Sequence, residues 1–522
     1  MIEDLLVAAF LSLAPVASRP DGTAGDGSPA EGVLQLSLEE CVRGVLQRNV
    51  ALRLAELSQA ETATEVTRAL GAFDPELYAS ATETDAEQPT ASSFQSPKNR
   101  SLNGGTGLRG LYRTGLAYDL AYQLAYNRQS PTNPFFGLNP TVSSDLTLHL
   151  TQPLLRNFGS TVTEAPVEQA RLLVARGDLD LYARIQETAF SAVQAYWNLV
   201  KARRDRDTAQ AALAVADELV RNNQKRLEAG VMTRLDVLTA QAEAARRLEQ
   251  KIRAENAVGR AEDALKLLLS PGVDLDEWRV AVEPTTPAGV GDEPLPAEEE
   301  AIVAAFADRA DLRALEIDLR AADLNLAVTE NQSLPQLDLL GSYGYAGLAG
   351  KQSGGKNKNN LDLWGNSLAP IRDLDFSTWA LGFSLSRPLG NRVAEAVERK
   401  ARYAKERAYV TWLERRMNVV HELRGALRDV ADGRAATQAA TQSRILAEQQ
   451  YQAEVVRLEN QHSTTFQVRE AQRDLFEAQA NETAAITQYE VLLAGLERSR
   501  GRLAQHYGVQ WRPEERLEGA RP

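Results

Sequence analysis

Residues 226–241 read RLEAGVMTRLDVLTAQ, and this stretch is typical of a turn between two helices. Gly230 suits the left-handed backbone conformation in which many helices end. Thr233 is a favourable N-cap residue for a following helix, and Asp236 stands three positions further on, where it can complete the cap. The stretch therefore predicts a helical hairpin whose tip lies near 229–233.

The chain on either side of this tip favours long helices. Proline is absent from Val167 to Ser270 and from Leu389 to Arg512, and proline in a helix interior costs about 3 kcal/mol. Apolar residues repeat every seven positions in the first stretch, which indicates a coiled-coil seam. One row holds Leu172, Leu179, Val193 and Val200, and the other holds Ala175, Tyr182, Ala189 and Tyr196. We expect helical hairpins at about 164–269 and 392–500, with first arms roughly 100 Å long.

The second half of the chain repeats the first. Arg457-Leu458-Glu459 repeats 226–228, which places a second tip near 459–464. The helical segments 50–72 and 309–331 also correspond, and each could stack end to end on a returning arm of its hairpin. Such self-similarity indicates two copies of one structural unit. We place the copies at 36–270 and 297–509, joined by a segment at 271–296.

Alternating segments stand between these helices, at about 76–153 and 336–388. Trp379, Leu381 and Phe383 are separated by small residues, so that one face of a strand is apolar and the other is small or polar. This pattern suits a transmembrane β-barrel, although a half-buried sheet of a soluble domain alternates in the same way.

The number of strands in the first copy must be even for the chain to return to its helices. The shared pair is expected at 76–86 and 143–153. Segments 101–111 and 116–127 could form an extra hairpin, so the first copy has two or four strands.

Composition restricts the class of protein. The chain has 522 residues, one cysteine and a net charge of −13. A single cysteine excludes an intrachain disulfide framework, and the acidic balance argues against a nucleic-acid partner. The longest uncharged run, 129–144, is shorter than the roughly 20 apolar residues of a membrane-spanning helix.

The amino terminus resembles an export signal, with an almost entirely apolar run at 5–17. We predict a signal peptide at 1–18 and a flexible leader at 19–35. Glu3 and Asp4 stand where basic residues are usual, so a frayed amphipathic terminus is the alternative. A polar tail is expected at 510–522.

Taken together, these features resemble the TolC-like outer-membrane efflux protein family. The resemblance extends from Leu38 to about Val509. Its motifs are the opening Leu38-Glu39-Glu40, the segment Gln152–Arg156, the tip at 226–241, and the four helix–strand junction prolines, Pro75, Pro153, Pro335 and Pro388. The family usually supplies four barrel strands per protomer, and the second tip departs further, with Gln461 opposite Gly230 and Gln467 opposite Asp236.

The resemblance implies an α+β membrane protein that forms a homotrimer. Its protomers would form a transmembrane β-barrel continuous with a long α-helical coiled-coil barrel. The barrel would lie in outer-membrane lipid of a Gram-negative-type bacterium, with a large periplasmic portion. The implied function is a passive exit duct for efflux or secretion, gated at the periplasmic helix tips. It would dock with a periplasmic membrane-fusion adaptor and an inner-membrane efflux pump or secretion ATPase.

Two sets of residues are candidate functional sites. The resemblance implies adaptor contact at the first tip, through Arg226, Leu227, Gly230, Val231, Thr233 and Asp236. The alternative is that Gly230, Thr233 and Asp236 only turn the chain and cap its helices. Carboxylates that close the tunnel end are expected near the second tip, at Glu454, Glu459 and Glu470, unless these are ordinary solvated charges.

No catalytic pattern is present in the sequence. The four histidines, His149, His421, His462 and His506, are scattered without metal-ligand spacing. We therefore expect neither an enzyme nor a cofactor nor a metal. Aromatic girdles or core packing are expected of Tyr122, Tyr126, Tyr343, Tyr345, Trp364 and Trp379. Polar loops at 127–142 and 351–360 are expected to be extracellular. The competing interpretation is a periplasmic or surface coiled-coil structural protein without a pore.

Overall fold

The computed structural model describes residues 33–90, 96–130, 137–270, 272, 275–289, 294–352, 361–460 and 462–509. The predicted signal peptide, the leader up to residue 32 and the polar tail from residue 510 lie outside these residues. So do Gln461 and parts of the two predicted extracellular loops, at 131–136 and 353–360.

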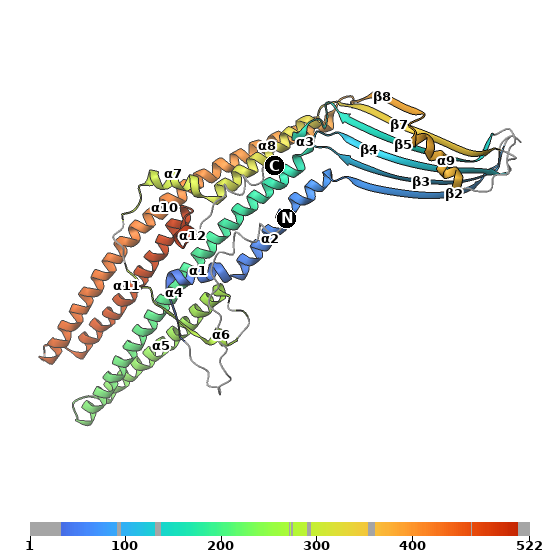
Figure 1. Ribbon diagram of the computed structural model, residues 1–522. Coiled ribbons are helices and arrows are strands. Elements are labelled where there is room, and N and C mark those ends of the chain that lie inside the picture. Colours follow the sequence, from blue (N-terminus) through green and yellow to red (C-terminus); the bar gives the residue numbers. More distant parts are fainter. Residues whose placement is uncertain are drawn as a thin grey trace, which may run out of the picture.

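Two long helical hairpins form one end of an elongated molecule (Figure 1). Helix α4, Ala165–Glu228, is followed by α5, Arg234–Leu269. Helix α10, Arg392–Glu459, is followed by α11, Thr465–Ser499. These bounds agree closely with the hairpins that the proline-free stretches predict.

Shorter helices extend the returning arms end to end. Helix α2, Val50–Leu70, begins where α5 ends: the Asn49 side-chain amide donates to the Leu268 carbonyl at 2.9 Å. Helix α8, Ala310–Gln332, begins where α11 ends, and Arg309 Nη1 donates to the Ser499 carbonyl at 3.0 Å. In both places a buried residue before the short helix binds the end of the returning arm. The returning arm and the short helix therefore act as one column.

These two composite columns and the two long helices, α4 and α10, lie side by side in one layer, as four columns in all. The column of α2 and α5 packs along α4, and α4 packs along the column of α8 and α11. That column packs along α10, which completes the layer. The wall therefore has two flanks, one formed by α2 and α5 and the other by α10.

The second end-to-end junction is ionic, whereas the first is neutral. Arg309 binds Asp311 at 2.7 Å and Glu422 at 2.9 Å, and Arg415 binds the same two carboxylates. Burial alone would raise the pKa of Asp311, but Arg309 and Arg415 hold that pKa below its ordinary value of 3.8. The second junction therefore depends on charges that acid removes.

A six-stranded antiparallel sheet forms the other end of the molecule, in the order β2-β3-β4-β5-β7-β8. Its strands are β2 Glu76–Glu87, β3 Lys98–Leu111, β4 Ala117–Ser130, β5 Leu138–Pro153, β7 Gln336–Gln352 and β8 Ser377–Ser386. The first half thus supplies four of the six described strands. The extra hairpin is present as β3 and β4.

The prediction of strands and a loop at 351–360 within 336–388 missed helix α9, Leu361–Arg372, which lies after the predicted loop. This helix packs on β5 and β7. The hydroxyls of Ser144 and Ser367 lie 2.7 Å apart and are fully buried. Gly347 permits this approach, because a Cβ there would collide with the Ser367 carbonyl. Pro370 inside the helix argued against helix in the sequence.

Several short elements complete the described fold. Strand β1, Val33–Leu36, pairs in parallel with β6, Ala281–Pro284. The remaining helices are α1 Leu38–Arg48, η2 Gly71–Phe73, α3 Ser160–Thr163, α6 Leu275–Arg279, α7 Glu298–Asp308 and α12 Leu503–His506. No helix in the described parts of the chain has both the length and the hydropathy needed to cross a membrane.

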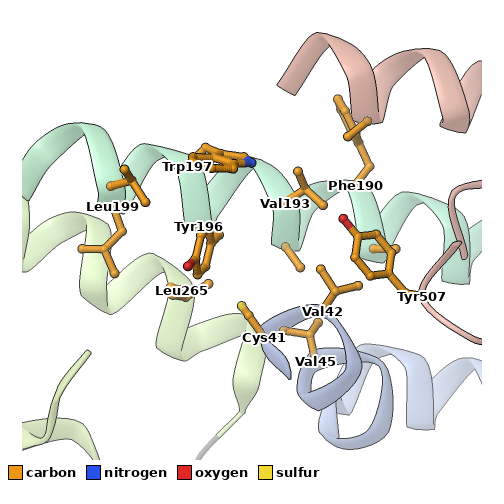
Figure 2. Close-up of a cluster of buried hydrophobic side chains, with 14 of the residues drawn as sticks. Cys41, Val42, Val45, Phe190, Val193, Tyr196, Trp197, Leu199, Leu265 and Tyr507 are labelled. Carbon is orange, nitrogen blue, oxygen red and sulfur yellow. The ribbon is translucent and has the colours of Figure 1, made fainter. Parts of the chain in front are cut away.

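The largest hydrophobic cluster lies midway along α4 (Figure 2). Tyr196 of α4 points toward Leu265 of α5 and Cys41 of α1, and Trp197 projects from the opposite side of α4. The Tyr196 hydroxyl also donates to the Leu36 carbonyl at 3.1 Å, which fastens β1 to α4. This cluster fixes the α2–α5 column against α4 at the level of its junction.

The ionic junction generates a pH-dependent prediction. Arg309→Met leaves Asp311 and Glu422 without one partner, which should lower the free energy of unfolding by about 2–4 kcal/mol at pH 7. Because the folded state lowers the pKa of Asp311, the stabilisation is present at neutral pH and is lost as the pH falls below 3.8. The melting-temperature difference between wild type and variant should therefore shrink from pH 7 to pH 3.

Asn49→Ala is the matched control, because it weakens the neutral junction. Its melting-temperature deficit should not change over the same pH range. A deficit of Arg309→Met that stayed constant down to pH 3 would contradict the ionic account.

Candidate functional site

The first hairpin tip is closed by hydrogen bonds of its own backbone. The N–H of Val231 donates to the Arg226 carbonyl at 2.9 Å, and the N–H of Gly230 donates to the Leu227 carbonyl at 3.0 Å. This pair of bonds is the Schellman motif, and Gly230 supplies the required positive φ of 75°. The end of α4 is therefore fully capped.

A reciprocal cap begins the next helix. The N–H of Asp236 donates to Thr233 Oγ1 at 3.3 Å, and the N–H of Thr233 donates to Asp236 Oδ2 at 3.0 Å. The hydrogen bonds from Thr233 lower the pKa of Asp236. Gly230, Thr233 and Asp236 thus have the structural role that the sequence offered as the alternative to adaptor contact.

Apolar side chains project from this tip. Val231 is 76% exposed and Leu235 is 71% exposed, and Leu238 is also exposed. In contrast, Val237 and Ala240 are buried. Leu235 and Leu238 were absent from the predicted contact set, although their spacing of three places them on one helix face. The exposed apolar residues, rather than the capping residues, are the part of the tip that is free for contact.

The second tip is closed by a matching backbone hydrogen bond. The N–H of His462 donates to the Arg457 carbonyl at 2.8 Å, which corresponds to the bond from Val231 to Arg226. Thr464 and Gln467 form a second reciprocal cap, with N–H···O distances of 3.4 and 3.3 Å. Gln467, which corresponds to Asp236 of the first tip, therefore forms the same kind of cap.

The predicted tunnel-end carboxylates have different surroundings. Glu454 accepts from Ser463 Oγ at 2.6 Å and from Arg457 Nη1 at 2.9 Å. These hydrogen bonds, first that of Ser463, lower the pKa of Glu454. Glu470 pairs with Arg473 at 2.8 Å on its own helix. The side chain of Glu459 lies outside the described residues. Within one chain, Glu454 and Glu470 therefore make hydrogen bonds and ion pairs inside the second hairpin.

A cavity of about 160 Å³ lies between the two hairpins above their tips. Its lining comes from all four arms and includes Asn222, Glu243, Arg247, Tyr451, Gln472 and Phe476. The hairpins are therefore less tightly packed against each other near the tips than at the central cluster.

The four predicted junction prolines stand where helices and strands meet. Pro75 and Pro335 directly precede β2 and β7, Pro153 ends β5, and Pro388 follows β8. The segment after β5 is fastened to the segment before β7. The N–H of Leu154 donates to the Leu337 carbonyl at 2.7 Å, and that of Arg156 donates to the Pro335 carbonyl at 3.3 Å. The junction ties the two halves of the chain together below the sheet.

A hollow of about 690 Å³ lies beside this junction, at the edge strand β2. Its lining includes Asp74, Glu76, Arg109 and His149. Among the described residues, no group of three or more His, Cys, Asp or Glu side chains could hold a metal ion.

Residues 42–270 match the family model described as outer membrane efflux protein. The first half of the chain is therefore similar to outer membrane efflux proteins. No curated protein sequence matches the chain significantly.

Solved outer-membrane channels share the fold of this chain over nearly its whole length. The CmeC outer membrane channel of Campylobacter jejuni is 16% identical, with 97% of this chain and 98% of that chain covered and a TM-score of 0.65. The outer membrane protein VceC of Vibrio cholerae is 18% identical, with 89% and 96% covered and a TM-score of 0.62. The MtrE outer membrane channel of Neisseria gonorrhoeae is 18% identical, with 93% and 97% covered and a TM-score of 0.60. At these identities the likeness establishes the fold.

The caps at the two tips generate a local prediction. Thr233→Val removes the hydroxyl that accepts from the Asp236 N–H, which should destabilise the start of α5 by about 1 kcal/mol. Amide hydrogen exchange over 234–237 should then be roughly fivefold faster. Thr464→Val should produce the same acceleration over 465–468, because the second tip has the same cap. Unchanged exchange at either tip would contradict its cap.

Proposed function

We propose that this chain forms a homotrimeric outer-membrane exit duct for efflux or secretion. The observation that supports it best is the one-layer wall, which has two unlike flanks with exposed apolar residues. A contact between unlike flanks repeats from copy to copy and closes a ring when the rotation allows it. A ring of such walls encloses a tunnel.

The flanks carry apolar side chains that one copy leaves in solvent. On α10, Tyr403, Val410 and Met417 repeat every seven residues and are all more than half exposed. On the opposite flank, Leu54 of α2 and Ile252 of α5 are 62% and 57% exposed. Heptad spacing is the pattern by which helices pack against neighbouring helices. We assign the α10 flank of one copy to the α2–α5 flank of the next.

The sheet supports placement in the outer membrane. Its apolar face, with Trp379, Leu381 and Phe383 all more than half exposed, suits lipid, and its polar face suits a water-filled lumen. The helices then extend into the periplasm as a coiled-coil barrel. The two halves, 36–270 and 297–509, act as two internal structural repeats of one unit. A coiled-coil structural protein without a pore has no use for such a sheet.

In this proposal the duct is passive, and an inner-membrane pump or secretion ATPase supplies the energy. A periplasmic adaptor binds the tips, chiefly through the exposed Val231, Leu235 and Leu238. Threefold symmetry brings Glu454, Glu459 and Glu470 into rings at the tunnel end, where carboxylates favour cations. Gating is a change in the packing of the helical arms at this end.

Purified protein should be a trimer that resists heat in detergent and conducts ions in planar lipid bilayers. Met417→Asp places a charge in the proposed contact between copies and should abolish the trimer and its conductance. Leu173→Asp is the control of equal charge on an exposed position of α4, which has a neighbouring column on both sides and belongs to neither flank; it tests whether any added charge on the arms has this effect. A wild-type protein that is water-soluble and does not conduct would exclude the duct.

Photo-crosslinking in the native host tests adaptor contact. A photoreactive residue at Leu235 should give an adduct that mass spectrometry identifies as a periplasmic adaptor. The same residue at Ile252, more than three helical turns above the tip, should give only adducts between copies of this chain. An adaptor adduct at 252 and not at 235 would place the docking surface elsewhere.

A further inference from the structure

The two edge strands of the sheet run in opposite directions. Strand β2 leaves the helical part of the molecule after Pro75, and β8 returns to it before Pro388. All the other neighbouring strands in the described sheet are antiparallel. If β8 of one copy lies beside β2 of another, the antiparallel pattern continues. An unpaired edge exposes a row of N–H and carbonyl groups that bind another strand.

The two faces of the sheet also continue across all six strands. One row of directly paired residues is Leu77, Leu108, Leu120, Leu148, Tyr343 and Trp379. The adjacent row on the other face is Tyr78, Gly107, Ala121, Thr147, Gly344 and Thr378. Along this row the apolar face runs from edge to edge, and the hairpin of β3 and β4 belongs to it. Further along the strands, helix α9 covers the same face at Ser144 and Gly347. A neighbouring copy would meet an apolar face on both sides.

The stagger of the strands matches a closed barrel. The row from Leu77, at the helical end of β2, reaches β8 at Trp379, six residues before Leu385 at the helical end of β8. In a symmetric ring, β2 of every copy begins at the same height, so Leu77 of the next copy lies beside the helical end of β8. The apolar faces of the two copies must also match, which requires an even shift. Each copy therefore contributes a stagger of about six or eight residues between its β2 and the β2 of the next copy. With strands about 4.8 Å apart and a rise of about 3.3 Å per residue, the strand tilt is about 35–42°. Closed barrels have tilts of about 35–45°.

The sheet is also as wide as the helical wall below it. Six strands at this tilt span about 37 Å of circumference. Four helical columns spaced by about 10 Å span about 40 Å. A sheet of four strands would span only about 25 Å. The added hairpin thus matches the width of the sheet to that of the wall.

We propose that three copies close a single 18-stranded barrel, in which β8 of each copy pairs antiparallel with β2 of the next. This inference rests on the proposed trimer and adds its strand pairing and its width. The barrel measures about 35 Å between opposite backbones, against about 25 Å for twelve strands. The hairpin of β3 and β4 thus increases the diameter of the β-barrel until it matches that of the helical tunnel.

Cysteine pairs test the strand pairing. In a Cys41→Ala background, Ala79→Cys on β2 is combined in turn with Leu381→Cys, Phe383→Cys and Leu385→Cys on β8. All of these positions lie on the apolar face. At least one pair should give disulfide-linked dimers and trimers on a denaturing gel after oxidation. The matched control, Thr106→Cys on β3 with the same β8 cysteines, should give none. Intact trimers without any link from position 79 would overturn the proposed pairing.

Images of detergent-solubilised trimers along their axis test the width. Wild type should show a barrel ring about 35 Å across, and a variant that lacks residues 98–130 should show about 25 Å. Equal diameters, or a wild-type ring of about 25 Å, would overturn the 18-stranded barrel. Since wild-type images alone decide the width, the result stands even if the deletion variant does not assemble. A failure of the proposed duct would be distinguishable, because the protein would then form no trimer, whereas a failure of this inference would leave intact trimers with another pairing or width.

Discussion

The architecture depends on the end-to-end stacking of a short helix on each returning arm. A returning arm reaches only part of the way along its partner, and the short helix supplies the remainder. Asn49 makes this contact in the first half and Arg309 in the second, each by donating to the last turn of the arm below. Without these contacts the long helices α4 and α10 would have unpaired upper halves. With them, the chain forms four columns of equal reach.

A layer of columns has no interior of its own beyond the seams between neighbours. Its stability therefore comes from repeated seams, reinforced by the central cluster around Tyr196 and Trp197. The outer flanks remain unpaired within one copy, as do the edge strands above them. Helices and strands thus leave the same two sides of the chain open, so the proposed contact between copies would cover both.

The sequence predicts much of this fold because its signals are local. The proline-free stretches predict the long helical arms, and Gly230 and Thr233 predict the first tip. The added hairpin follows from alternation between Tyr118 and Tyr126. Helix α9 was missed because Gly365 and Pro370 oppose a helix, and only its packing on β5 and β7 stabilises it. The pairing of β1 with β6 joins two four-residue strands far apart in the chain, and no local pattern records it.

The candidate site was predicted in part for the same reason. The capping residues at the first tip were recognised, but the exposed Leu235 and Leu238 were overlooked, since only the structure separates them from the buried Val237. The absence of glycine from the second tip left the geometry of that turn open. The structure places a backbone bond from His462 to Arg457 and the cap of Thr464 there, which match the bonds of the first tip.

The caps have a mechanical consequence. A tip that is closed by its own hydrogen bonds resists unwinding, so a hairpin that rotated would do so as a rigid lever below the central cluster. From Tyr196 to Glu228, α4 is about 48 Å long at 1.5 Å per residue. A rotation of about 5° at the cluster would then displace the tip by about 4 Å. A small repacking around Tyr196 and Leu265 is thus amplified at the far end, and the widest movement occurs where the hairpins are least tightly packed.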